Sequence, residues 1–157
     1  MQAEPTLPTD IDEWIPQRGA MQLLTRVLEA DEDHAVAEVR IDADGLFLRD
    51  GRVPAWIGIE YMAQTIAAWA GARGRRAGRP GPRLGLLLGS RRFSASCDGF
   101  PEGATLRIEV VCELVGDNGL GLFDCRITHD GRPMAAATVS VFEPEDAMAL
   151  LAPGVAA

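Results

Sequence analysis

Hydrophobic and polar positions alternate in the segment LLTRVLEADEDHAVAEVRID, residues 23–42. Ala35, Ala37 and Val39 occupy every second position of its second half, and Glu38 lies between two of them. A period of two is typical of a strand with one buried face, and the acidic run in the middle is typical of a turn. The segment therefore predicts an antiparallel hairpin of two strands, each about 6–8 residues long.

The segment VPAWIGIEYMAQTIAAWAG, residues 53–71, predicts one long helix over 54–72. Pro54 suits the first turn of a helix, where its missing N–H costs nothing, and the glycines and prolines of GRRAGRPGPR end the helix. Glu60 is the one charged residue of the segment. Because a helix that is apolar nearly all round is buried, we expect it to be enclosed on most sides. Its hydrophobic residues are Trp56, Ile57, Ile59, Met62, Ala63, Ile66, Ala67 and Trp69.

From residue 83 onward the chain contains four segments of strand length. They read RLGLLLGSRRFSAS, ATLRIEVVCELV, LGLFDCRITH and RPMAAATVSVFEP, and the turn signals DGFPEG, GDNG and HDGR separate them. Four strands joined by such turns predict an antiparallel meander. Together with the first hairpin and the helix, they predict an α+β domain in which an antiparallel six-stranded sheet wraps around one long central helix.

The length and composition favour one domain. A chain of 157 residues with 47% hydrophobic content can bury a core of its own. We expect a mobile lead-in over residues 1–13, a single domain over 14–143, and a short C-terminal helix and tail over 144–157. No basic segment followed by an apolar one opens the chain, and no apolar run approaches the roughly 20 residues that span a bilayer. We therefore expect a soluble, cytoplasmic protein without a membrane span.

The charge is unevenly distributed along the chain. The formal net charge is −8, yet residues 66–97 hold seven arginines and no acidic residue. Such an acidic protein is a poor candidate for general nucleic-acid binding, because its own field opposes contact with phosphates. The basic block could instead dock an acidic partner or a phosphate through Arg75, Arg76 and Arg79. The alternative interpretation is a solvated loop.

The cysteines and histidines offer little catalytic chemistry. Cys97, Cys112 and Cys125 form no C-x-x-C pair, so we expect buried, reduced thiols. His34 and His129 both lie in sequences typical of turns on a solvated edge. No spacing typical of a metal site or a nucleotide-binding loop occurs, so we expect neither metal nor nucleotide.

Three segments carry a resemblance to a known family. They are IPQRGAMQLLTRVLEAD, PAWIGIEYMAQ and FPEGATLRIEV, in this order along the chain. The sequence resembles the hotdog-fold 3-hydroxyacyl-(acyl carrier protein) dehydratases of the FabZ type, and in particular the ApeP-like dehydratase-like proteins of aryl polyene and related pigment pathways. The resemblance covers roughly residues 13–143 and implies the hotdog fold.

The resemblance also implies an assembly and a reaction. Family members form homodimers or trimers of dimers, and a histidine from one chain acts with a helix carboxylate from the other to dehydrate a 3-hydroxyacyl thioester. The resemblance assigns the carboxylate to Glu60, the amide donors for the thioester carbonyl to Ala55 or Trp56, and the helix amide side chain to Gln64. The acyl carrier protein would be a partner, and phosphopantetheine would enter only as part of the substrate.

The catalytic histidine of the family is absent at its expected position. Gly45-Leu46-Phe47 stands where the family has Gly-His-Phe, fourteen residues before Glu60. Leucine cannot transfer a proton. Gln17 stands in the opening turn where relatives often have a histidine. The sequence therefore does not show whether the chain is active without this histidine.

Three functional interpretations remain open. Dehydration needs a base for the α-proton, an acid for the leaving hydroxyl and donors for the thioester oxygen, and one carboxyl group can serve as base and then as acid. A thioesterase of the same fold would use Glu60 to activate water. A non-catalytic subunit would bind acyl chains, or pair with an active paralogue whose histidine completes a site with Glu60. If Glu60 is purely structural, it bonds Gln64 one helical turn away.

Overall fold

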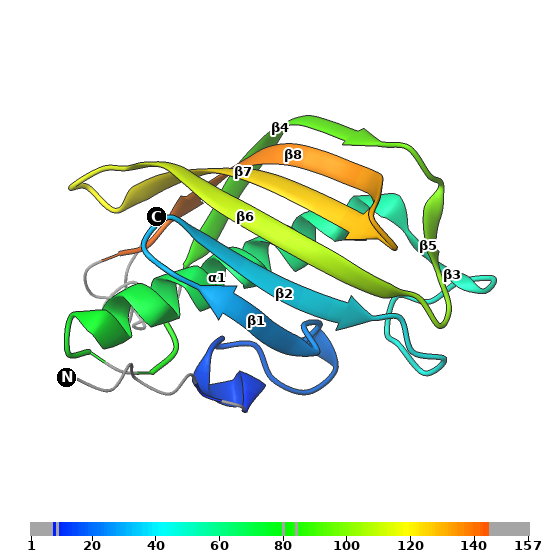
Figure 1. Ribbon diagram of the computed structural model, residues 1–157, viewed down its shortest axis with the longest axis horizontal. Helices are drawn as coiled ribbons and strands as arrows, with labels where there is room; N and C mark the ends of the chain where they lie inside the picture. The colour runs from blue at the N-terminus through cyan, green and yellow to red at the C-terminus, as the bar shows by residue number, and fades with distance from the viewer. Residues whose placement is uncertain (1–7, 9, 80, 84, 145–157) are drawn as a thin grey trace, which may run out of the picture.

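A six-stranded antiparallel sheet curves around one long helix, α1 (Gly58–Arg76), which lies lengthwise along one face of the sheet (Figure 1). The computed structural model describes residues 8, 10–79, 81–83 and 85–144. The strand order is β1-β2-β6-β7-β8-β4. The predicted α+β architecture is confirmed. The strands are β1 (Arg26–Ala30), β2 (His34–Arg40), β4 (Leu86–Ala95), β6 (Thr105–Val115), β7 (Leu120–His129) and β8 (Arg132–Phe142).

The predicted bounds of the helix were wrong at both ends. Pro54 ends a short strand, β3 (Arg52–Pro54), which pairs with β5 (Gly99–Pro101) in a small second sheet. A 3-10 turn, η3 (Ala55–Ile57), then leads into α1. At the other end the helix continues to Arg76, beyond the predicted residue 72. Two further 3-10 turns, η1 (Ile11–Glu13) and η2 (Gly19–Met21), precede β1.

The predicted meander holds for three of the four late strands. β6, β7 and β8 are successive neighbours, but β4 pairs with β8 and so lies at the edge of the sheet. This order differs from the prediction because strand pairing is a non-local property that turn signals do not specify. The consequence is that β4 has a strand partner on one side only among the described residues.

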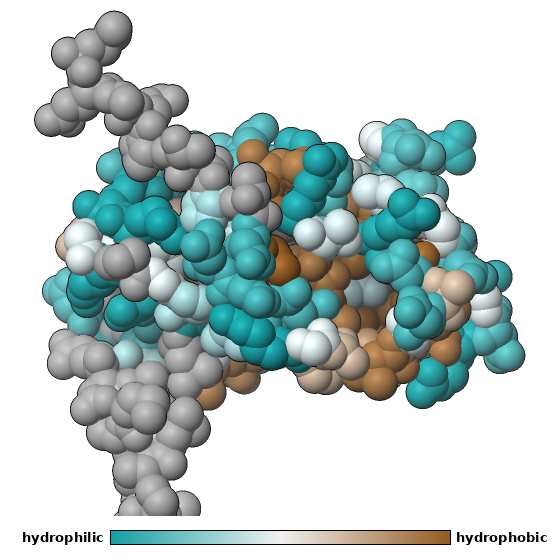
Figure 2. All heavy atoms as spheres, turned by 90° about the horizontal axis from the view of Figure 1, so that it is seen from below, coloured by the Kyte–Doolittle hydropathy of each residue, from teal (hydrophilic) through white to brown (hydrophobic). Residues whose placement is uncertain are grey.

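The core lies between the sheet and one side of α1. In β6 the inward residues Leu106, Ile108 and Val110 are fully buried. Thr105 and Arg107, which flank Leu106, are exposed. This alternation is the period of two that a half-buried strand requires. The edge strand β4 differs, because nearly all its residues are exposed. Figure 2 shows hydrophobic surface that remains uncovered between hydrophilic residues on one face of the molecule.

The segment that precedes β1 packs on the helix. Trp14 and Ile15 are buried, and a Cβ added to Gly71 of α1 would lie 2.9 Å from the Trp14 carbonyl oxygen, so only glycine permits this approach. The expected C-terminal helix and most of the expected lead-in lie outside the described residues. No helix in the described part of the chain has the length and hydrophobicity needed to cross a bilayer.

Candidate functional site

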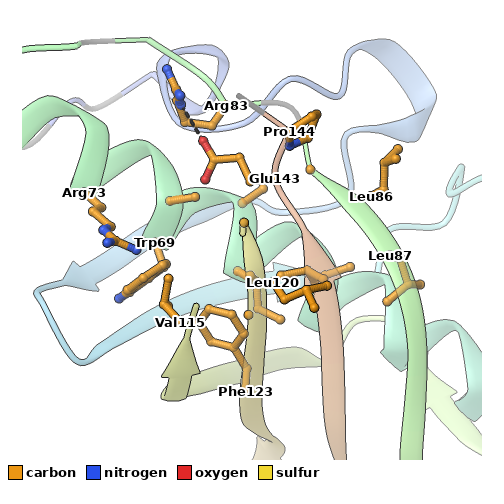
Figure 3. Close-up of a pocket in the computed structure, with 18 of the residues that line it drawn as sticks. Trp69, Arg73, Arg83, Leu86, Leu87, Val115, Leu120, Phe123, Glu143 and Pro144 are labelled. Atoms are coloured by element: carbon orange, nitrogen blue, oxygen red, sulfur yellow. Dashed lines mark hydrogen bonds and ion pairs between the residues drawn. The ribbon is translucent and has the colours of Figure 1, made fainter. Parts of the chain in front are cut away.

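A groove of about 520 Å³ lies beside α1, between the helix, the loop before β1 and residues of the strands β4, β7 and β8. The helix contributes small side chains, the loop before β1 contributes Pro16 and Gln17, and the edge strand contributes Leu86 and Leu87. Residues of the turn between β6 and β7 also line the groove, and Figure 3 labels Val115 and Leu120 at the two ends of that turn. A largely apolar groove with few polar groups is the usual form of a site for a small molecule or an acyl chain. The helical residues that line it are Glu60, Ala63, Ile66, Ala67, Trp69, Ala70, Arg73 and Gly74.

Glu60 is the carboxylate at one end of this groove. It lies in the first turn of α1, is half-buried, and accepts a hydrogen bond of 3.1 Å at Oε1 from Gln64 Nε2. The expectation that the helix is enclosed on most sides was wrong in part, because Trp56, one turn before Glu60, is 64% exposed. The carboxylate therefore faces a groove that the chain itself leaves open.

Gln64 holds Glu60 and the preceding loop in register. Its side chain is fully buried; Nε2 also donates to the Met21 carbonyl oxygen at 2.8 Å, and Oε1 accepts from the Leu23 N–H at 2.9 Å. These bonds, with the one to Glu60, occupy both amide hydrogens and the oxygen. The structure thus places Gln64 beside the Glu60 carboxylate. The hydrogen bonds of its amide hold the carboxylate and the loop before β1 in position.

The start of the helix offers one of the two expected amide donors. The Ala55 N–H donates to the Asp98 carbonyl oxygen at 3.2 Å and is occupied. The Trp56 N–H has no acceptor among the described residues. Free N–H groups at a helix start can polarise a carbonyl oxygen. Trp56 is therefore the one of the two with a free donor, but neither residue lines the groove.

Neither Leu46 nor the two histidines belong to the groove. Leu46 is 45% exposed in the loop before β3. His34 lies in the β1–β2 turn with Nε2 3.1 Å from Glu29 Oε2 and Nδ1 2.8 Å from Asp31 Oδ2. The hydrogen bond with Glu29, opposed by partial burial and assisted by Asp31, raises the pKa of His34. His129 Nε2 lies 3.4 Å from Asp130 at the β7–β8 turn.

The arginine block lies at the opposite end of the groove from Glu60. Arg83 forms a 2.7 Å ion pair with Glu143 there, and Arg73 lies over the Trp69 ring at 5.6 Å from the ring centre (Figure 3). Arg79 also lines this end, whereas Arg75 and Arg76 do not. Arg76 donates to the Asp31 carbonyl oxygen at 3.3 Å. Some arginines of the block thus contact residues of this chain, and the others add positive charge to the surface.

Sequence reasoning missed several residues of the site. Trp69 and Phe123 meet edge to face with ring centres 5.1 Å apart and form part of the groove wall. Nothing local in the sequence brings Phe123 or Glu143 to the helix, because both come from late strands. The spacing of Arg73 four residues after Trp69 could have indicated their contact.

Comparison with known structures and families identifies the fold. The structure is similar to the dehydratase heterocomplex ApeI:P from Xenorhabdus doucetiae, with a TM-score of 0.83 and 29% identity over 94% of this chain and 97% of the other. A hypothetical thioesterase with coenzyme A from Streptococcus pneumoniae TIGR4 matches with a TM-score of 0.60 and 18% identity over 75% of this chain and 86% of the other. The PaaI protein of E. coli matches with a TM-score of 0.58 and 15% identity over 74% and 77%.

These likenesses confirm the hotdog fold that the sequence predicted. No curated protein sequence matches the chain. The family model of the ApeP-like proteins, described as ApeP dehydratase, matches residues 9–152 and so covers nearly the whole sequence. The chain therefore belongs to the ApeP-like dehydratase family.

Proposed function

We propose that this protein acts on 3-hydroxyacyl thioesters bound to an acyl carrier protein, with Glu60 as acid and base. The observation that carries the proposal is the placement of Glu60 at the end of an apolar groove, where the buried Gln64 orients it. Membership of the ApeP-like dehydratase family supports the same class of reaction. The fatty-acid or polyene type of pathway follows from this class and is part of the proposal.

The proposed reaction requires one carboxyl group and one carbonyl-stabilising donor. The Glu60 carboxylate removes a proton from C2 of the acyl chain while the free Trp56 N–H polarises the thioester oxygen. The C3–O bond then breaks, a C2–C3 double bond forms, and the proton leaves with the hydroxyl group as water. Protons and electrons balance without a further reactant. Ala55 takes no part, because its N–H is occupied.

A second candidate is a subunit whose site is completed by another chain. Leu46 cannot supply the second proton-transfer group, and the groove is partly open to solvent. The solved relative is a heterocomplex, ApeI:P. In this candidate an active dehydratase covers the groove and contributes the missing histidine opposite Glu60. A homodimer that covers the groove without a histidine is the simpler alternative.

The decisive experiment measures turnover of a 3-hydroxyacyl-carrier-protein thioester by mass spectrometry. The purified protein is assayed alone and mixed with a hotdog dehydratase that carries the histidine, each time beside a Glu60→Gln variant. General acid–base catalysis contributes about 10²–10⁴-fold, so Glu60→Gln should lower the rate by that factor. His129→Gln is the matched control, because His129 lies at a turn away from the groove.

The outcomes separate the candidates. Loss of water by the protein alone supports the dehydratase, and release of free acid indicates a thioesterase. Turnover that needs the second protein and still depends on Glu60 supports the completed site. If Glu60→Gln turns over substrate as fast as the unaltered protein in every mixture, Glu60 has no catalytic role.

The carrier protein is proposed to dock beside the arginine end of the groove through Arg75, Arg76 and Arg79. Arg76 and Arg79 are exposed, and Arg79 lines the groove. Attraction between exposed charges is screened by salt. Replacing the three arginines by serine should therefore weaken carrier-protein binding at low salt and reduce its salt dependence, which calorimetry can measure. Unchanged low-salt binding would rule out this docking site.

A further inference from the structure

The loop before β1 places a second polar side chain in the groove wall. Gln17 and its neighbour Pro16 line the same cavity as Glu60. Gln17 is half-buried, as Glu60 is. The groove thus carries a carboxamide as well as the carboxylate to which the proposed function assigns the chemistry.

The carboxamide of Gln17 has no partner within the described part of the chain. Its Oε1 is shut off from solvent and accepts no hydrogen bond, and it is the one buried side-chain nitrogen or oxygen of the described residues in this condition. Buried acceptors are almost always paired, because an unpaired one forfeits its hydrogen bond to water. An unpaired amide in a groove wall indicates a group that is satisfied when the groove is occupied.

A loosely held loop does not explain this unpaired amide. The Gln17 carbonyl oxygen accepts from Arg18 Nη1 at 2.9 Å and from Gln22 Nε2 at 3.2 Å. Gln64 ties Met21 and Leu23 of the same loop to the helix. Only the end of the Gln17 side chain is free, and its last torsion is soft, so the oxygen can turn toward the groove at little cost.

We propose that Gln17 is a substrate-binding residue that accepts a hydrogen bond from the 3-hydroxyl group of the acyl thioester. A hydroxyl group donates one hydrogen bond and keeps two lone pairs. When Gln17 Oε1 accepts the hydroxyl hydrogen, a lone pair of the hydroxyl oxygen is left to receive the proton that Glu60 delivers. This assignment rests on the proposed function for the identity of the ligand, and it makes Gln17 the residue that selects hydroxylated acyl chains.

Binding of two pantetheine amides tests the proposal without turnover. One ligand carries a 3-hydroxyacyl chain and the other the saturated acyl chain of the same length, with an amide in place of the thioester. Calorimetry gives the affinity of the protein, in its native assembly, for each. A neutral hydrogen bond corresponds to roughly a 2- to 10-fold change in affinity. The unaltered protein should therefore bind the hydroxylated ligand about 2- to 10-fold more tightly.

Three variants isolate the role of the amide oxygen. Gln17→Met keeps the length of the side chain and should remove the preference for the hydroxylated ligand while keeping the affinity for the saturated one. Gln17→Glu keeps an acceptor and should retain the preference. Gln17→Ala removes the amide a second way and serves if Gln17→Met fails to fold.

The possible results are distinct from those of the turnover experiment. No preference in the unaltered protein, or a preference that survives both Gln17→Met and Gln17→Ala, overturns the assignment even if Glu60 is catalytic. A preference that depends on Gln17 upholds it even if no turnover occurs, in which case only the role of Glu60 fails.

Discussion

The two sides of helix α1 use similar small and apolar residues for different purposes. On the core side Met62 and Ala68 are fully buried, and Tyr61 packs against Phe100 with ring centres 5.8 Å apart. On the groove side Ala63, Ala67 and Ala70 are only half-buried and line the groove. The core side is packed by residues of this chain, and the groove side is open to a ligand or a partner.

This difference explains the position of Glu60, the one acidic residue of α1. A carboxylate on the core side would be desolvated without compensation and would destabilise the fold. On the groove side Glu60 remains half-buried and accepts a hydrogen bond from Gln64. The apolar surroundings that suggested burial from the sequence are instead the surface of a site.

Truncation of a core-side residue should have the largest effect on stability. Met62→Ala removes a fully buried side chain, and such substitutions cost about 2–5 kcal/mol of unfolding free energy. Ala63→Ser, the adjacent change on the groove side, should cost only about 0.5 kcal/mol, the difference in helix propensity. Denaturant unfolding measures both. Equal losses at the two positions would mean that the groove side is packed as tightly as the core side.

Enlargement of two neighbouring alanines should distinguish the core side of α1 from its groove side by ligand binding as well as by stability. Ala68→Leu forces a larger side chain into the core and should cost about 1–3 kcal/mol of stability. Ala67→Leu extends into the groove and should change stability by no more than about 0.5 kcal/mol. It should, however, weaken acyl-ligand binding at least tenfold, because it fills the space the chain would occupy. The comparison fails if Ala67→Leu destabilises as much as Ala68→Leu or leaves binding unchanged.

The sequence predicted the elements better than their arrangement. The alternation around Ala35 and Val39 and the turn signals after residue 83 are local, so they indicated the hairpin and the four late strands. The position of β4 beside β8 depends on pairing between distant segments and was missed. Pro54 was assigned to the helix because proline suits both a helix start and the end of an edge strand.

The site was predictable only where a residue type is unusual for its surroundings. Glu60 stood out as a carboxylate in an apolar helix, and Leu46 as a departure from a motif. Gln17 stood out only as the residue where relatives often have a histidine. Its unpaired amide was not predictable, because the environment of the amide arises from packing of the first loop on a helix more than forty residues later in the chain. Glu143 reaches Arg83 only through the pairing of β4 with β8.

The β1–β2 turn contacts α1 at Trp69 and Arg76, on the boundary between the core side and the groove side of the helix. Trp69, which packs on Phe123 and also lines the groove, donates from Nε1 to the Glu32 carbonyl oxygen at 3.2 Å. In the same turn the His34 imidazole lies between the carboxylates of Glu29 and Asp31. Arg76 reaches the turn from α1. The charge state of His34 should therefore affect how firmly this boundary is held.

Replacement of His34 should have the smallest effect, and one that depends on pH. The hydrogen bond with Glu29 and the contact with Asp31 raise the pKa of His34 in the folded state. A raised pKa stabilises the fold fully below the unfolded value near 6.5, and this stabilisation is lost as the pH rises through the folded-state pKa. His34→Gln should therefore cost about 0.2–1 kcal/mol at pH 6 and less at pH 8.5.

Unfolding of the unaltered protein and of three variants across this pH range would measure the effect. Glu29→Gln removes one of the two carboxylates that hold the imidazole and should shrink the loss of stability between pH 6 and 8.5. Glu32→Gln removes the same charge from the same turn without altering either carboxylate, so it should leave that loss in place. If His34→Gln lowers stability equally at both pH values, the imidazole supports the turn by packing alone. The contacts of this turn with α1 would then not depend on protonation of His34.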